Sequence, residues 1–369
     1  MKLKKLIRFL EQIAPPTFQE SYDNSGLIVG DPQVEIKGVL ICLDSVESVL
    51  DEAIEKGCNV VLAHHPIVFK GLKRLTGKNY VERVIIKAIK HDIAIYACHT
   101  NLDNVKLGVN KRICDKIGLS KTKILAPKRG LIKKLSVHTP TEQADKVRNA
   151  LFAAGAGHVG NYVETSFNVI GAGTFKAGAG ANPFVGKVGE RHYEPEVKID
   201  VIYTIEREGR ILKAMFDSHP YEEIAYDLIP LTNQHNEIGS GMIGELEDFM
   251  DEMDFLKHLK SVMQTDCVKY TALTNNPVRR VAVCGGSGVF LLRSAIAQKA
   301  DVFITADFKY HEFFDADGKI VVADIGHFES EQFTIDLFYD LITEKFSEKF
   351  SNFAVYKTSV NTNPVNYLT

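Results

Sequence analysis

The chain has 369 residues and a formal net charge of −3, with 45% hydrophobic and 25% charged residues. This length predicts more than one domain, and the composition is typical of an ordinary globular protein. The interleaved acidic and basic residues argue against a dedicated nucleic-acid-binding protein, and no run reaches the ~18 apolar residues of a membrane span.

The first 16 residues predict an amphipathic helix. Arg8 and Glu11 interrupt the apolar stretch, and the prolines Pro15 and Pro16 end it. This pattern does not fit a signal peptide. The six cysteines form no CxxC pair, as expected for reduced thiols. We therefore expect a cytoplasmic protein with no membrane segment.

Strand and helix patterns alternate in the two outer parts of the chain. Buried strands are predicted at 36–44, 59–65, 93–99, 279–286, 301–307 and 319–326. Helical periodicity separates them, for example over 80–92. Strands separated by helices form βαβ units and largely parallel sheets. The fold class is therefore α/β, with two α/β halves forming one three-layer unit.

The middle part of the chain has a different pattern, β-α-β-β-α-β. Its elements are expected as strands at 131–140, 161–170, 196–205 and 225–231, and helices at 141–155 and from about 207. Thr141 is the expected N-cap of the first helix, and the glycine-rich stretch 171–195 is expected to be mobile. This order predicts a ferredoxin-like inserted domain. The predicted domain ranges are 1–128, 129–234 for the insert, and 235–369.

Polar side chains follow the predicted strands, where open α/β sheets bind ligands. They are Asp44, the pair His64-His65, and the motifs HTNLD (99–103), CGGSG (284–288), TADFKYH (305–311) and DIGHFESE (324–331). Because these ligating side chains share one kind of position, we expect them to meet at one edge of the fold.

The motif AHHP places two histidines at the end of a strand. Neighbouring strand residues point to opposite faces, so one histidine would be in the core and the other at the surface. Pro66 favours a second interpretation, because it restricts His65 and makes continuation of a regular strand unfavourable. Both imidazoles would then face one crevice.

Two further motifs supply the remaining ligand candidates. His327 and Glu331 are four residues apart at the start of a predicted helix, so they lie on one face; the alternative is a solvated helix face. Asp103 is either a ligand or the N-cap of the following helix, and His99 is expected to orient a ligand through a hydrogen bond.

These imidazoles and carboxylates suit a cation such as zinc, manganese, iron or cobalt, with zinc preferred. Two ions about 3.5–4 Å apart that share a carboxylate would use all five residues. The ligand candidates are His64, His65, Asp103, His327 and Glu331.

Three other motifs have less certain roles. CGGSG lacks the spacing of a dinucleotide fingerprint and the lysine of a P-loop, and its amides either bind substrate phosphate or cap a helix. Lys309 and His311 are candidate catalytic residues beside the metals, or else the start of a surface helix. In YDNSGL, residues 22–27, Asp23 and Asn24 fit a structural turn equally well.

Taken in order, six motifs resemble the Nif-three-like family, also called GTP cyclohydrolase 1 type 2 homologues. They are YDNSGL, AHHP, HTNLD, CGGSG, TADFKYH and GHFESE. The resemblance covers residues 22–331, and the insert is similar to the PII and CutA-like domain of the longer bacterial form. Tyr22 departs from the tryptophan of many members, but it keeps an aromatic side chain.

The resemblance implies a dinuclear metal site carried by the five ligand candidates, in a homohexameric toroid. We expect a metal-dependent hydrolase in which two divalent ions activate water towards a nucleotide-like substrate, by ring opening or by phosphoester cleavage. His311 would shuttle protons, and Lys309 or the GGSG amides would hold phosphate. The alternative is a non-catalytic metal or small-molecule sensor, or a scaffold, acting through the insert.

Overall fold

The computed structural model describes residues 1–346 and 353–368, which divide into two compact units. The first unit combines Met1–Pro127 with Asn236–Thr369, and the second is Lys128–His235. The long strands β5 (Ser120–Arg129) and β10 (Gln234–Met250) cross the two boundaries between the units. Each unit has its own sheets and its own hydrophobic core.

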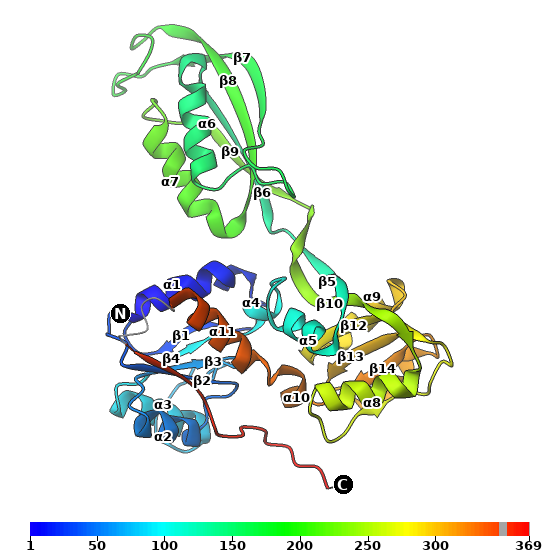
Figure 1. Ribbon diagram of the computed structural model, residues 1–369. Coiled ribbons are helices and arrows are strands. Elements are labelled where there is room, and N and C mark those ends of the chain that lie inside the picture. Colours follow the sequence, from blue (N-terminus) through cyan, green and yellow to red (C-terminus); the bar gives the residue numbers. More distant parts are fainter. Residues whose placement is uncertain (347–352, 369) are drawn as a thin grey trace. The chain divides into compact units, whose positions relative to one another are not determined.

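The first sheet of the first unit has five strands. Their order is β1 (Gly26–Val29), β4 (Ala94–Ala97), β3 (Val60–Ala63), β2 (Gly38–Cys42) and β15 (Ala354–Lys357). All neighbours are parallel except β1, which pairs antiparallel with β4 at the edge. The covering helices include α1 (Leu3–Ile13), α2 (Glu47–Glu55), α3 (Tyr80–Lys90) and α11 (Thr334–Phe346) (Figure 1). Every residue of β2, β3 and β4 is buried, as expected for strands covered on both faces.

The second sheet of this unit has six strands. Their order is β11 (Lys269–Tyr270), β14 (Val321–Asp324), β13 (Val302–Ala306), β12 (Val278–Ser287), β10 and β5. Strands β12, β13 and β14 are parallel and form its buried centre. The neighbouring helices are α5 (Val109–Ile117), α8 (Glu252–Val262) and α9 (Leu292–Ala297). Within residues 1–346 and 353–368, no helix has the length and apolar character to cross a membrane.

The two halves of the first unit exchange strands. Strand β15, near the end of the chain, pairs parallel with β2 of the first sheet. Strand β5, from the first half of the chain, is the edge strand of the second sheet. Each half therefore completes the sheet of the other, and the α/β fold class expected from the sequence is confirmed.

The second unit is a four-stranded antiparallel sheet covered by two helices. The strand order is β7 (Phe167–Lys176), β8 (Arg191–Thr204), β6 (Ile132–Pro140) and β9 (Tyr226–Leu231). Helices α6 (Ala144–Ala153) and α7 (Glu208–Ser218) lie on one face of this sheet (Figure 1). Strand residues that point to the helices, such as Val137 and Ile199, are fully buried. The residues that alternate with them line the open face.

Two details of this unit differ from the sequence-based expectation. Strand β7 begins at Phe167 and continues to Lys176, where it pairs with Arg191, so both ends of the glycine-rich stretch are strand. Glycine is intrinsically unfavourable in strands, but residue-by-residue pairing with β8 outweighs this weak preference in β7. Thr141 caps no helix, because its hydroxyl donates to the Pro195 carbonyl, and α6 begins three residues later.

The segment that follows β15 is held to the first sheet by the buried carboxylate of Glu52. Thr358 and Ser359 donate their hydroxyls to it, the Ser359 amide adds a further bond, and Lys56 forms an ion pair. Burial alone would raise the pKa of Glu52, but these bonds outweigh burial and lower the pKa to about 2. The segment that follows β15 is therefore anchored at its start by one charged side chain.

We expect Glu52→Gln to lower the free energy of unfolding by about 1–3 kcal/mol near neutral pH, because it removes a hydrogen-bonded charge. The folded-state pKa is below the ordinary value of 4.5, so this stabilisation is present above pH 4.5 and is lost as the pH falls towards 2. Urea unfolding of variant and parent, near neutral and near pH 3, measures both effects. Glu55→Gln, an exposed change on the same helix, is the control. A difference between variant and parent that does not shrink at low pH would contradict the assignment.

Candidate metal centre

The first unit contains a cleft of about 980 Å³ at the carboxyl ends of its parallel strands. Residues that follow β2, β3 and β4 of the first sheet line it, together with residues that follow β12, β13 and β14 of the second. All of the lining residues belong to this unit. The cleft is therefore where the topology brings the polar ends of both sheets together.

His64 and His65 follow β3 directly and extend its pairing with β2. The His64 amide donates to the Cys42 carbonyl, and the His65 amide donates to the Leu43 carbonyl. Beyond them Pro66 turns the chain away, and the two imidazole rings lie 4.9 Å apart. The predicted convergence of the two rings on one region is thus observed.

Each of these histidines is oriented through Nδ1. His64 is fully buried, and its Nδ1 donates to the Cys98 carbonyl at 3.0 Å. His65 Nδ1 lies 2.7 Å from Asp44 Oδ1. With Nδ1 engaged in this way, Nε2 of both rings is directed into the site.

Helix α10 (His327–Glu331) supplies a third imidazole and the central carboxylate. Its first and last residues share one face, as the four-residue spacing predicts, and their Nε2 and Oε2 atoms lie 3.2 Å apart. His327 Nδ1 is held by Asp307 Oδ2 at 2.7 Å. Glu331 is only 3% exposed, so the spacing does not reflect a solvated helix face.

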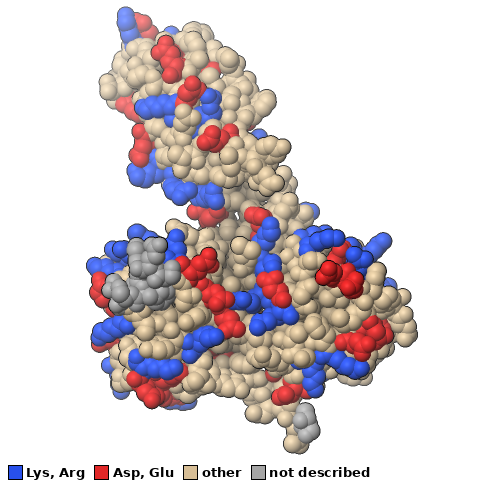
Figure 2. All heavy atoms as spheres, in the orientation of Figure 1, with Lys and Arg blue, Asp and Glu red and all other residues tan. Residues whose placement is uncertain are grey.

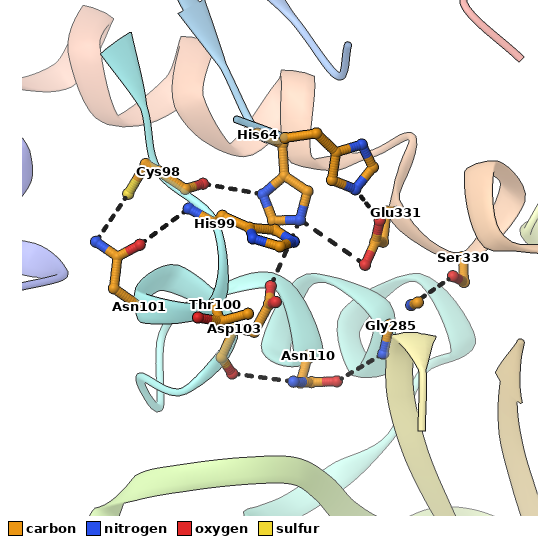
Figure 3. A network of polar contacts seen from close by, with 12 residues as sticks. His64, Cys98, His99, Thr100, Asn101, Asp103, Asn110, Gly285, Ser330 and Glu331 are labelled. Atoms are coloured by element: carbon orange, nitrogen blue, oxygen red, sulfur yellow. Dashed lines mark hydrogen bonds and ion pairs between the residues drawn. The ribbon is translucent and has the colours of Figure 1, made fainter. Parts of the chain in front are cut away.

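Asp103 is the last residue of the short helix α4 (Thr100–Asp103). The next helix, α5, has Gly108 as its N-cap, so Asp103 is not the cap that the sequence left open. Its Oδ1 instead faces His64 Nε2 at 3.6 Å. Figure 3 shows the side chains of Asp103 and Glu331 pointing toward the His64 ring from different elements.

The two carboxylate oxygens of Glu331 face different neighbours. Oε1 lies 3.8 Å from His64 Nε2, which also faces Asp103. Oε2 lies 3.0 Å from His65 Nε2 and 3.2 Å from His327 Nε2. Two groups of ligand atoms therefore share one carboxylate, and within each group the atoms lie within 4.8 Å of one another.

Two buried atoms at this position have no hydrogen-bond partner in the described structure. They are His64 Nε2 and Asp103 Oδ1, which face one another. Leaving such atoms unsatisfied is costly, and an ion between them would remove the cost. Ligand atoms about 2.0–2.2 Å from a tetrahedral ion lie roughly 3.3–3.6 Å apart, which is close to the observed spacing. The residues present therefore fit a bound transition-metal ion.

Burial and mutual charge shift the titration of the site residues strongly. Burial lowers the pKa of His64 to about 4, against the opposing effect of Glu331, so the ring is neutral at pH 7. Burial also lowers the pKa of His65, but hydrogen bonds with Asp44 and Glu331 outweigh it and raise that pKa to about 10. Burial, with the charge of Glu331, raises the pKa of Asp103. Such a buried, mutually dependent cluster is typical of a functional site.

His99 lies closer to the centre than its expected orienting role requires. Its Nδ1 is 2.7 Å from Asp23 Oδ1, and it has a ligand atom within 4.8 Å of those of His64 and His65. Asp23 also accepts bonds from the Thr100 amide and hydroxyl. The sequence motif around Asp23 is thus a support for His99 rather than only a turn.

The two candidate catalytic residues lie away from this cluster. Lys309 and His311 are exposed, and neither lines the cleft. His311 packs instead against the exposed rings of Tyr310 and Phe314. Their catalytic role stays a prediction that the contacts within this chain do not support.

The glycine loop, residues 284–288 at the end of β12, packs against the site. The Gly285 amide donates to Asn110 Oδ1, and the Gly286 amide donates to Ser330 Oγ. These two amides are therefore not free to hold phosphate. A Cβ added at Gly286 would overlap Glu331 Oε1, so this glycine leaves the space that the central carboxylate occupies.

The C-terminal segment is part of the site, although no sequence motif indicated it. Thr362 Oγ1 donates to Asp44 Oδ2 at 2.6 Å, and the other oxygen of Asp44 holds His65. Asn363 donates to Glu329 Oε1 at 2.9 Å. Tyr367 also lines the cleft. Only the folded chain relates these residues to the histidines, because they are far apart in sequence.

We expect Gly286→Ala to destabilise the protein more than Gly318→Ala does. Both glycines have similar positive φ values, +61° and +64°, so the backbone strain of about 1 kcal/mol is common to them. A Cβ at Gly318 meets nothing, whereas at Gly286 it must displace Glu331, which adds about 1–3 kcal/mol. Urea unfolding of the two variants measures the difference. Equal losses of stability would show that Glu331 is not confined by this contact.

Comparison with known proteins identifies the family. Residues 1–364 match the model of Duf34/NIF3 (NGG1p interacting factor 3). Proteins named GTP cyclohydrolase 1 type 2 homolog from Halalkalibacterium halodurans and Bacillus subtilis are 39% and 36% identical, over at least 98% of each chain.

Solved structures agree with this result. A Bacillus cereus protein related to NIF3 is 35% identical and has a TM-score of 0.84, over 100% of this chain and 99% of that one. Staphylococcus aureus protein SA1388 is 30% identical with a TM-score of 0.80 over the same shares. The resemblance inferred from the six motifs is therefore confirmed, and the chain belongs to the Duf34/NIF3 family.

Proposed function

We propose that the cleft holds a dinuclear metal centre ligated by His64, His65, Asp103, His327 and Glu331. The observation that carries the proposal is the division of the Glu331 carboxylate, one oxygen toward each group of ligand atoms. One group is His64, Asp103 and Oε1, and the other is His65, His327 and Oε2. The nitrogen and oxygen donors favour zinc, with manganese, iron or cobalt as alternatives.

We propose further that the protein is a metal-dependent hydrolase. Two divalent ions would supply a Lewis acid and water of lowered pKa, the chemistry of many hydrolytic centres. Residues of this chain orient the three imidazole ligands. The Cys98 carbonyl holds Nδ1 of His64, Asp44 holds Nδ1 of His65, and Asp307 holds Nδ1 of His327. His99, held by Asp23, is placed to accept a proton from a group bound beside the cluster.

The cleft supports a nucleotide-like substrate. Its volume of about 980 Å³ accommodates a small organic molecule, and exposed aromatic rings of Tyr22, Phe69 and Phe290 line it. Such rings can stack against a base. Lys269 lines the cleft as well, paired with Asp324 at 2.8 Å, and offers a positive charge to a phosphate. The names of the relatives, which refer to GTP cyclohydrolase, agree with this substrate class.

Acidic and basic side chains are interspersed on the face of each unit that Figure 2 shows. This view therefore offers no continuous basic stripe to follow a nucleic-acid backbone.

We propose that the protein associates with copies of itself, with the hexameric toroid of the family resemblance as the expected form. Exposed apolar side chains such as Tyr310 and Phe314 support self-association. Light scattering measures the mass in solution, and the mass of a single chain would contradict the proposal.

Metal content tests the centre directly. Gently purified protein should contain about two transition-metal ions per chain by elemental analysis. Because each group has its own imidazoles, His64→Ala and His327→Ala should each retain about one ion. Glu331→Ala should retain fewer than either, since it removes the shared ligand. His91→Ala, an exposed histidine away from the cluster, is the control. A parent with less than one ion, or unchanged content in all three variants, would refute the centre.

Turnover distinguishes a hydrolase from the alternative, a non-catalytic sensor or scaffold that acts through the second unit. Metal-loaded protein is incubated with nucleoside triphosphates, dinucleotides and phosphodiesters. We expect one class to be hydrolysed, with the rate reduced at least about a hundredfold in His65→Ala. His99→Gln should lower kcat more than KM if His99 moves a proton. Absence of turnover across the panel, with full metal content, would favour the sensor.

A further inference from the structure

The second unit contains a cavity that the metal centre does not use. It measures about 720 Å³, within the range of small-molecule sites, and residues of this unit alone line it. Strands β7 and β8 provide one wall through alternate residues, including Gly173, Phe175, Glu196 and Lys198. These side chains lie on the open face of the sheet, because their neighbours in sequence, such as Val197 and Ile199, are buried under the helices.

Aromatic rings line this cavity. Tyr221 has its ring centroid 6.2 Å from that of Phe175 and 6.3 Å from that of Phe184. Phe184 is 54% exposed although it is a large apolar side chain. Rings at these separations, partly open to solvent, offer flat apolar surfaces to a planar ligand.

A carboxylate without a cationic partner lies at the wall of the cavity. Glu196 Oε1 accepts a hydrogen bond from the Tyr221 hydroxyl at 3.0 Å, which fixes the side chain. None of the lysines, arginines and histidines that the structure describes forms an ion pair with Glu196; Lys198, two residues along, approaches Asp200 at 3.8 Å instead. Its Oε2 is therefore available to accept hydrogen bonds from a ligand.

Gly173 leaves the space that this carboxylate occupies. A Cβ at residue 173 would lie 2.6 Å from Glu196 Cδ and would overlap Oε2. Residue 173 has no positive φ, so its backbone conformation does not require glycine. On the same strand face, a Cβ at Gly171 would meet nothing within 4 Å. The missing Cβ at residue 173 therefore lets the carboxylate lie against the strand, at this position in the cavity wall.

We propose that this cavity binds a flat, nitrogen-rich group whose edge presents adjacent N–H donors, as guanine and the guanidinium ion do. The aromatic rings would stack on its plane, and Glu196 would accept its N–H groups. Lys176 and Lys198, which also line the cavity, would favour an anionic substituent on the same molecule. This site is independent of the metal centre and gives the second unit a ligand-binding role of its own.

Calorimetric titration of the full chain with guanosine monophosphate, adenosine monophosphate and free arginine tests the proposal. It also shows whether the cavity prefers a guanine base or a guanidinium ion as the group that presents the adjacent N–H donors. We expect guanosine monophosphate or arginine to bind, and adenosine monophosphate to bind at least about tenfold more weakly, because its base lacks the paired donors. Glu196→Gln and Gly173→Ala should each weaken binding by at least about tenfold. Gly209→Ala, a control on helix α7 that does not line the cavity, should change it by less than about twofold, since its Cβ also has open space.

Binding must also survive loss of the metal centre. His64→Ala should bind the probe as the parent does, because it alters only the first unit. Loss of binding in His64→Ala with retention in Glu196→Gln would place the probe at the metals and overturn the proposal. No binding of any probe up to millimolar concentration, with circular dichroism showing folded protein, would overturn it as well.

Discussion

The polar site of the first unit is organised around the contacts of the buried Glu331 carboxylate. A charge that is 3% exposed needs compensation, and here three imidazoles from two parts of the chain surround it. Removing any one partner leaves the buried carboxylate with an unmatched charge or an unfilled hydrogen bond. The surrounding architecture reflects this demand, because Gly286 leaves space for the carboxylate and three acceptors fix the outer nitrogens of the imidazoles.

The exchange of strands between the halves explains how these groups meet. Each sheet alone presents its polar residues at its own carboxyl edge. Because β15 joins the first sheet and β5 the second, the two halves are tied into one unit. Histidines that follow β3 can then face a helix that follows β14. The second unit has a separate core, so changes in it need not disturb the cleft.

Much of the first unit was predictable from local pattern. Continuous apolar runs indicated β2, β3 and β4, and the position of polar residues after each strand indicated the cluster. The four-residue spacing of His327 and Glu331 holds on α10 because helical geometry is regular. These features depend on residues that are close together in the sequence, so a single sequence is enough to predict them.

Other features depend on contacts that no short pattern encodes. The strand β7 continues through glycines because β8 pairs with it residue by residue. The amides of the glycine loop were candidate phosphate ligands, but Asn110 and Ser330 already occupy two of them. Lys309 and His311 follow a strand of the second sheet, yet the chain turns them outward to solvent. The support of Asp44 by Thr362 joins residues 318 positions apart.

This last support connects two distant parts of the first unit. The residue that holds Asp44, and through it His65, belongs to the segment after β15. The start of the same segment is anchored to α2 by the Glu52 carboxylate. A change that detaches the segment from Glu52 would therefore also loosen the hydroxyl that supports Asp44, so a substitution on α2 can reach the histidine cluster through the backbone.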